Sequence, residues 1–267
     1  METTVQDVLI REITSGMAEW PEVLAIAEGG SRAAGNADVH SDIDLYVYVD
    51  EPVPVARRSA FIRFRSDDAE IDNRVWEPGD IWTDRVTRIA IDVMYRTRSW
   101  IEDRLSLVLD RHQASLGYST CFWHNVLTSR VHFDRIGWFA GLQRKASVPY
   151  PEGLAHEIIA RNYPLLRDAH SAFARQIIRA AERSDVVSVN HRTAAFLASY
   201  FDVLFALNKV PHPGEKRLLR LVTGLPLCPS RLSGRIAQLL TAGTECRTAD
   251  LELALNGLVE DLDALRQ

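Results

Sequence analysis

The sequence has few cysteines, few lysines and no long apolar run. Its cysteines are odd in number and far apart, which excludes a disulfide framework or a zinc site of regular spacing and indicates a reducing compartment; they are Cys121, Cys228 and Cys246. The most apolar window, residues 194–207, is too short to cross a bilayer and contains Asp202, so no membrane association is predicted. The first residues lack a basic segment followed by an apolar stretch, which predicts no signal peptide and a cytoplasmic protein.

Basic charge is also limited, because only three of the 31 basic residues are lysines and the net charge of the 267-residue chain is −5. Residues 1–146 carry 17 basic and 23 acidic side chains, whereas residues 147–267 carry 14 and 13. Neither part is basic enough for a long nucleic-acid footprint, which argues against a nucleic-acid acceptor. The acidic first part suits a cationic acceptor instead.

A turn of small residues stands close to a pair of carboxylates. Gly30-Ser31 precedes Asp42-x-Asp44 by eleven residues, and the pair opens an apolar run over residues 43–49. Alternate residues of a strand share one face, so the two carboxylates would lie roughly 6–7 Å apart at Cα and could share a divalent metal ion. The N–H groups of the turn and the Ser31 hydroxyl can bind phosphate.

A third carboxylate, Asp92, lies in the middle of the β-rich run 86–95. A charge inside such an apolar run is costly unless it is paired or bound to metal. If this strand lies beside the strand over residues 43–49, Asp92 completes a cage of three carboxylates. Two metal ions in such a cage stabilise the attacking and the leaving oxygen of an in-line displacement, which is the requirement of nucleotidyl transfer.

The pattern Gly-Ser-x(10)-Asp-x-Asp, followed by an aspartate on a later strand, resembles the nucleotidyltransferase superfamily named for DNA polymerase beta. The closer resemblance is to its small bacterial branch, which includes the antibiotic nucleotidyltransferases, and residues 190–220 resemble the helical second domain of an uncharacterised group in that branch. The resemblance implies that Ser31 contacts the nucleoside triphosphate and that Asp42 and Asp44 bind two Mg²⁺ ions. It also implies that Asp92 binds the catalytic Mg²⁺ and can accept the proton of the acceptor hydroxyl.

The resemblance suggests further ligands whose alternative is an ordinary surface residue. Arg32 follows the serine where other members often carry a smaller residue, and it is either a phosphate contact or a surface residue. The family's second domain supplies basic residues to the triphosphate, which makes Lys216 the first candidate and Lys209 the next. Arg192 could also reach phosphate or pair with an acid. Glu77 lies in a segment from which small-molecule nucleotidyltransferases take an acceptor-binding residue, unless it is an exposed loop acid.

The patterning predicts a domain boundary in a segment rich in proline and glycine, residues 146–153. The first domain, residues 1–146, should combine strands with helices, beginning with a helix that has a Thr3–Gln6 capping box. Its expected strands are 23–27, 43–49, 69–76, 86–95 and 131–134, and its expected helices are 5–17, 55–65, 98–113 and 119–129. The second domain, residues 147–267, is expected to be helical over 153–168, 168–184, 189–208, 214–223, 229–241 and 248–265.

These patterns predict an α/β (α+β) fold, in which a nucleotidyltransferase domain with a small mixed sheet is followed by a helical bundle; the resemblance implies four or five strands. The expected function is metal-dependent transfer of AMP from ATP to a hydroxyl of a small molecule such as an antibiotic, with two Mg²⁺ ions. Two alternatives remain: a toxin–antitoxin-type enzyme that modifies protein or tRNA, and a catalytically silent nucleotide-binding module. The intact set of three acids argues against the silent module. The acceptor, the preferred nucleotide and the oligomeric state stay open.

Overall fold

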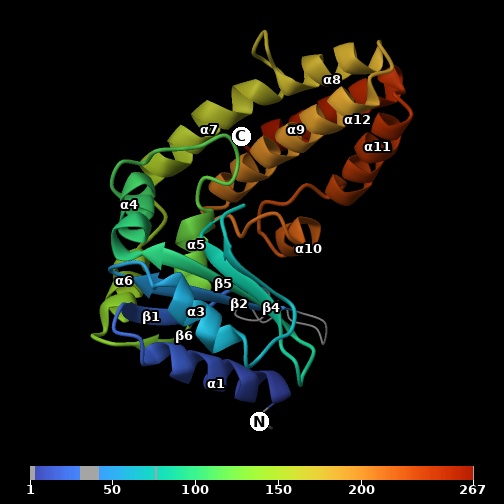
Figure 1. Ribbon diagram of the computed structural model, residues 1–267. Helices are drawn as coiled ribbons and strands as arrows, with labels where there is room; N and C mark the ends of the chain where they lie inside the picture. The colour runs from blue at the N-terminus through green and yellow to red at the C-terminus, as the bar shows by residue number, and fades with distance from the viewer. Residues whose placement is uncertain (1–3, 31–41, 76, 267) are drawn as a thin grey trace. The chain divides into compact units, whose positions relative to one another are not determined.

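The computed structural model describes residues 4–30, 42–75 and 77–266, which form two compact units (Figure 1). Unit 1 consists of Met1–Ser106 and Asn125–Val148, and unit 2 of Leu107–His124 and Pro149–Gln267. The chain therefore leaves unit 1 after Ser106, returns to it at Asn125, and leaves it again after Val148. Two domains divided after residue 146 stay a prediction.

Unit 1 is built on a six-stranded mixed sheet of order β3-β4-β5-β2-β1-β6. Neighbouring β2 and β5 are parallel, whereas every other neighbouring pair is antiparallel. The strands are β1 (Val23–Glu28), β2 (Ile43–Val49), β3 (Ala69–Asn73), β4 (Gly79–Thr83), β5 (Ala90–Thr97) and β6 (Arg130–Asp134). The expected mixed sheet is confirmed, but it has six strands because Pro78-Gly79, interpreted as the end of one strand, leads directly into β4.

Two helices pack on the face of the sheet to which its alternating apolar side chains point. The first helix, α1 (Val5–Ala18), and α3 (Val55–Ile62) pack on one face, where they bury an apolar core with β1, β2 and β5 (Figure 1). This core includes Ile13, Met17, Ile26, Val47, Ile62 and Val93. The capping prediction was wrong by one residue: the Thr4 side chain accepts a hydrogen bond from the Asp7 N–H, and Asp7 in turn accepts one from the Thr4 N–H.

Three further helices follow β5 before residue 150: α4 (Arg98–Leu109), α5 (Cys121–Thr128) and α6 (Trp138–Ala146). Of these, α6 is not expected from the sequence. It begins after Gly137, which has a left-handed backbone and offers no side-chain cap, so the usual sequence signal for a helix start is absent. Its Phe139 ring packs against Tyr48 of β2, at 4.8 Å between ring centroids, and thereby covers part of the other face of the sheet.

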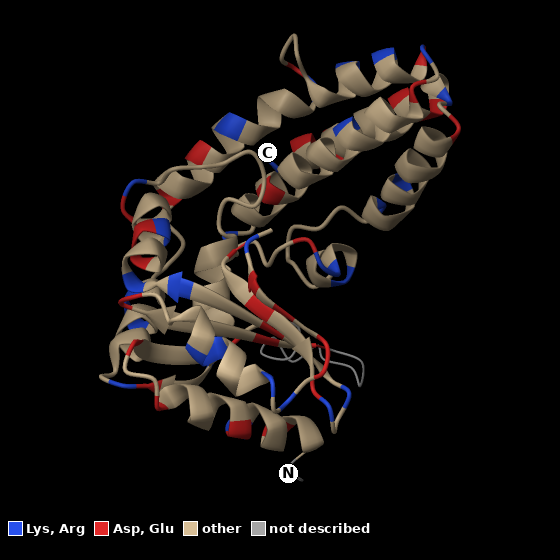
Figure 2. Ribbon diagram, in the orientation of Figure 1, with Lys and Arg blue, Asp and Glu red and all other residues tan. Residues whose placement is uncertain are grey.

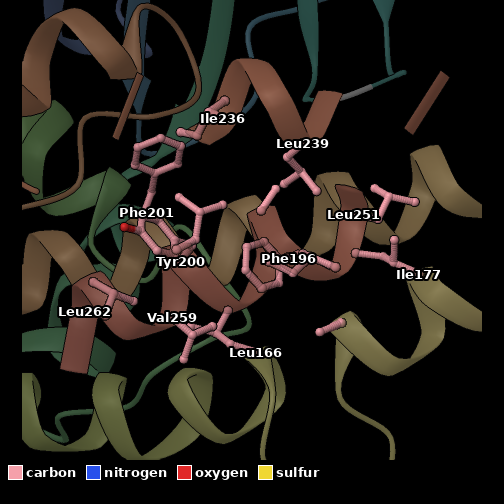
Figure 3. Close-up of a cluster of buried hydrophobic side chains, with 14 of the residues drawn as sticks. Leu166, Ile177, Phe196, Tyr200, Phe201, Ile236, Leu239, Leu251, Val259 and Leu262 are labelled. Carbon is pink, nitrogen blue, oxygen red and sulfur yellow. The ribbon is translucent and has the colours of Figure 1, made fainter. Parts of the chain in front are cut away.

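Unit 2 is helical among its described residues, as the bundle prediction required. Its main helices are α7 (Glu152–Leu166), α8 (Phe173–Ala181), α9 (Val186–Leu207), α10 (Leu218–Val222), α11 (Leu232–Thr244) and α12 (Thr248–Leu265). Their apolar faces meet in one core, which contains Phe196 and Tyr200 of α9 together with Leu239 and Leu251 (Figure 3). Tyr200 is fully buried there, so it belongs to the core. No helix among the described residues is long and apolar enough to span a membrane.

Candidate active site

Two of the predicted carboxylates stand side by side on the sheet of unit 1. In the parallel pair of β2 and β5, Asp44 is the register partner of Asp92. Neighbouring strands lie about 4.8 Å apart, so the two side chains leave adjacent backbones on one face, and both are half-buried. Figure 2 shows acidic residues on the strands of this sheet. The register therefore joins two carboxylates that are far apart in sequence.

The two faces of these strands differ in chemistry because side chains alternate. Leu45, Val47 and Val93 point into the apolar core beneath α1 and α3. The opposite face carries Asp44 and Asp92, and further along the same strands it carries two tyrosines and an arginine, Tyr46, Tyr48 and Arg96. The charged face is thus a direct consequence of the alternation read in the sequence, whereas its alignment across strands comes from the register.

The remaining residues of the predicted metal and phosphate site are only partly described. Asp42 is exposed and directly precedes β2, which begins at Ile43. Ser31 and Arg32 lie outside the described residues. Within residues 4–30, 42–75 and 77–266, no group of three or more His, Cys, Asp or Glu side chains converges on a point.

A glycine turn lies directly on this face. The Gly29 N–H donates a hydrogen bond to the Asp44 carbonyl oxygen at 3.0 Å. Gly30 has a φ of 67°, which glycine adopts at little cost, and a Cβ there would lie 1.9 Å from Asp44 Oδ2. A Cβ on Gly29 would lie 2.1 Å from the Tyr46 ring. Only glycine therefore fits at these two positions. Because the turn lies so close to Asp44, a ligand that contacts the turn is within reach of the Asp44 carboxylate.

Further along the same face lies an ion pair that the sequence did not predict. Arg96, 5% exposed, donates from Nε and Nη2 to the two Glu77 carboxylate oxygens at 2.7 and 2.9 Å. Its Nη1 also donates to Asn125 Oδ1 at 3.0 Å, and its guanidinium lies 4.0 Å from the centroid of the Tyr46 ring. Glu77, predicted as an acceptor-binding residue, is therefore engaged by an arginine. One feature of the sequence could have indicated this pair. Arg96 lies four residues after Asp92 in an apolar strand, and therefore on the same face.

Electrostatics on this face favour neutral tyrosines. Burial raises the pKa of Tyr46, and the neighbouring Asp44 raises it further, although the Arg96 guanidinium opposes both effects. Burial likewise raises the pKa of Tyr48 to about 12. Both phenols therefore stay protonated at neutral pH, so the acids of this face are its carboxylates.

Apart from Arg32, the basic residues predicted to bind the triphosphate lie in unit 2. Arg192 is exposed on α9, and Lys209 forms an ion pair with Glu152. Lys216 is exposed in the turn before α10, without an ion pair to any described residue. Their assignment to the triphosphate stays a prediction.

Five strands of the sheet, β1 to β5, lie in a segment that matches a known family. Residues 10–106 match the model of the nucleotidyltransferase domain family. These residues are a nucleotidyltransferase domain. It contains the glycine turn, all three predicted carboxylates and the Arg96–Glu77 pair. No curated protein matches the chain.

A solved structure also resembles the chain: a nucleotidyltransferase-like protein from Exiguobacterium sibiricum 255-15, crystallised and solved at 1.90 Å resolution. The similarity covers 94% of this chain and 73% of that protein, with 13% sequence identity and a TM-score of 0.45.

The charged face of the nucleotidyltransferase domain has the chemistry to hold a hard divalent cation. Magnesium in phosphate-transfer sites is usually bound through one or two carboxylates together with substrate phosphates, rather than by a complete protein cage. Asp44 and Asp92 supply two carboxylates in register, and Asp42 stands two residues before Asp44. The absence of a three-residue cluster among the described residues is compatible with such a shared site.

Proposed function

We propose that the nucleotidyltransferase domain transfers AMP from ATP to a hydroxyl group of a small-molecule acceptor, with two Mg²⁺ ions. The observation that carries the proposal is the register of Asp44 with Asp92 beneath a turn of two glycines. Two carboxylates in register on neighbouring strands can ligate one divalent cation through their oxygens. Substrate phosphates, held by the glycine turn and Ser31, would complete the coordination of that cation.

The acceptor oxygen would attack the α-phosphorus and form a new P–O bond, while the bond to the β-phosphate oxygen breaks and pyrophosphate leaves. Bound Mg²⁺ would supply Lewis-acid stabilisation of the charge that develops on the phosphate oxygens. Asp42 and Asp44 would hold the ion on the triphosphate side, and Asp92 would hold the ion beside the acceptor and accept the proton of its hydroxyl. Arg32, Arg192, Lys209 and Lys216 are the proposed cations for the triphosphate, of which Lys209 would exchange Glu152 for phosphate.

A cationic small molecule suits the acceptor side of this face. Glu77 is bound to Arg96, but Glu70 of β3 lies in one cross-strand row with Ile81, Asp92 and Asp44. Glu70 is exposed and stands two strands, or about 10 Å, from Asp92. Exposed Ile81, between them, offers apolar contact. Glu70 therefore replaces Glu77 as the proposed acceptor-binding acid.

The test measures nucleotide binding first and transfer second. ATP with Mg²⁺ should raise the melting temperature, because a ligand of the folded state stabilises it, whereas ATP alone should raise it much less. Labelled ATP with Mg²⁺ should then label a small-molecule acceptor in a panel of aminoglycosides, lincosamides and RNA. Equal shifts with and without Mg²⁺ would contradict the metal site, and labelling of RNA alone would contradict the small-molecule acceptor.

A further inference from the structure

We infer that Arg96 is a positioning residue that fixes the Tyr46 ring, and through it the glycine turn and the Asp44 carboxylate. The activity readout of this inference rests on the proposed function, but its structural readout does not. Arg96 lies four residues after Asp92 on β5, on the same face of the sheet. The chain of contacts runs from Glu77 through Arg96 to Tyr46 and on to the turn.

The Tyr46 ring is held from several sides. Gly29 lies against its edge, so closely that no side chain fits at Gly29, while the Arg96 guanidinium lies over its face. Asn125 accepts a hydrogen bond from Arg96 Nη1 and so helps to hold the guanidinium over that face. Any shift of the ring would therefore displace Gly29, whose N–H is bonded to the Asp44 carbonyl.

Arg96 itself has little freedom. Its guanidinium bonds both Glu77 carboxylate oxygens, and a bidentate pair of this kind fixes orientation as well as distance. With 5% of its surface exposed, the charge must be paired, so loss of Glu77 would leave a buried cation uncompensated. Glu77 is thus the anchor of the arrangement rather than a group that binds the acceptor.

The opposite face of the same sheet provides a matched comparison. Arg58 of α3, also 5% exposed, donates from Nη1 to Asp80 Oδ1 at 2.7 Å, and its guanidinium lies 4.8 Å from the centroid of the Tyr95 ring. Tyr95 precedes Arg96 in the chain and faces the other way. Both arginines thus combine an ion pair with a tyrosine ring, but of the two only Arg96 contacts the tyrosine that lies against the glycine turn.

The experiment compares Arg96→Gln with Arg58→Gln, at a temperature at which both variants are folded. Both should lower the melting temperature, because each removes a buried cation and leaves the carboxylate of its ion pair without it. Only Arg96→Gln should accelerate amide hydrogen exchange at Gly29 and weaken Mg²⁺-dependent ATP binding, by about 10–100-fold, as expected when a group that orients a metal ligand is lost. Arg96→Lys keeps the charge without the bidentate geometry. Its Gly29 exchange rate and its ATP affinity should therefore lie between those of the wild type and of Arg96→Gln.

The outcomes are separable. Equal Gly29 exchange in Arg96→Gln and Arg58→Gln, or equal ATP affinities, would overturn the positioning role and leave Arg96 a stabilising residue only. If Arg96→Gln does not fold, Glu77→Gln is measured in its place, with the same expected acceleration at Gly29. If the wild-type protein does not bind ATP in a Mg²⁺-dependent manner, the proposed function fails, and Gly29 exchange alone still decides the inference.

Discussion

Carboxylates occupy two contrasting environments in this protein. On the sheet of unit 1, Asp44 and Asp92 are half-buried register partners beside a glycine turn. In unit 2, Asp202 is 1% exposed and is enclosed by hydrogen-bond donors. It accepts from the Ser119 N–H at 3.0 Å, from Ser119 Oγ at 2.6 Å and from Asn162 Nδ2 at 3.4 Å.

The difference separates a structural carboxylate from the pair that we propose to bind metal. The donors around Asp202 tie the segment before α5 to α7 and α9 within unit 2, so this side chain holds the fold together. Asp44 and Asp92 instead lie next to each other on one face of the sheet, where both can ligate one divalent cation. Burial and hydrogen bonding alone therefore do not distinguish the proposed site, whereas the alignment of two carboxylates beside the glycine turn does.

The largest effect is expected for Asp44→Asn. Loss of a carboxylate shared by the proposed metal ions should lower turnover by on the order of 10³-fold or more. The fold should be retained, because asparagine keeps the size and the polar character of the side chain. Pyrophosphate release and thermal melts would measure both, with Asp202→Asn as the control that keeps turnover. Wild-type turnover in Asp44→Asn would refute the metal role of this face.

Asp92→Asn should divide binding from chemistry. If Asp92 contacts only the ion beside the acceptor, Mg²⁺–ATP affinity should change little while turnover falls to background, as for an interaction made mainly in the transition state. Calorimetric titration with Mg²⁺–ATP beside a pyrophosphate assay would check this. A loss of affinity as large as that in Asp44→Asn would instead make the two carboxylates equivalent.

Gly30→Ala should disturb the site through the backbone. The added Cβ would overlap Asp44 Oδ2, and the φ of 67° is unfavourable for alanine, so either the turn or the carboxylate must move. We expect Mg²⁺-dependent ATP affinity to fall by roughly tenfold or more, as for a displaced metal ligand. Gly234→Ala is the control, since a Cβ at Gly234 meets no atom within 4 Å. Unchanged affinity in Gly30→Ala would show that the turn lies away from the nucleotide.

The smallest effects concern pH and unit 2. Burial raises the pKa of Asp202 to about 6, so the folded state binds its proton more readily than the unfolded state and stability falls as pH rises from about 4 to 6. Burial lowers the pKa of His212 to about 4, so its contribution to stability is lost as pH falls from about 6.5 to 4. The two slopes oppose each other between about pH 4 and 6.

Substituting either Asp202 or His212 should reveal the pH dependence of stability that the other residue causes. Relative to wild type, Asp202→Asn should gain stability as pH rises from 4 to 7, by on the order of 1–3 kcal/mol at 1.36 kcal/mol per pKa unit. The wild type should be more stable than His212→Gln at pH 7, and this difference in the free energy of unfolding should shrink as pH falls from 7 to 4. Urea denaturation at several pH values measures both differences. Parallel pH curves for Asp202→Asn and wild type would mean that Asp202 does not titrate in this window.

Much of the domain could be read from local pattern. Each strand that carries a predicted carboxylate was placed, because an aspartate within an alternating apolar run fixes both the strand and its face. The helices of unit 2 followed from apolar spacing and from prolines between them. Local pattern failed where a signal was missing or ambiguous: α6 begins at an uncapped glycine, β4 begins at the glycine interpreted as a strand end, and the cap of α1 is Thr4.

The sequence by itself determined which side chains share a face, since alternation and helical spacing are properties of the local backbone. It therefore determined that Asp44 faces away from the core and that a turn of glycines precedes it. Only the tertiary structure decided which residues of distant segments meet: Asp44 with Asp92 across β2 and β5, and Arg96 with Glu77. Such pairings depend on strand order and register, which long-range packing fixes and which no local spacing encodes.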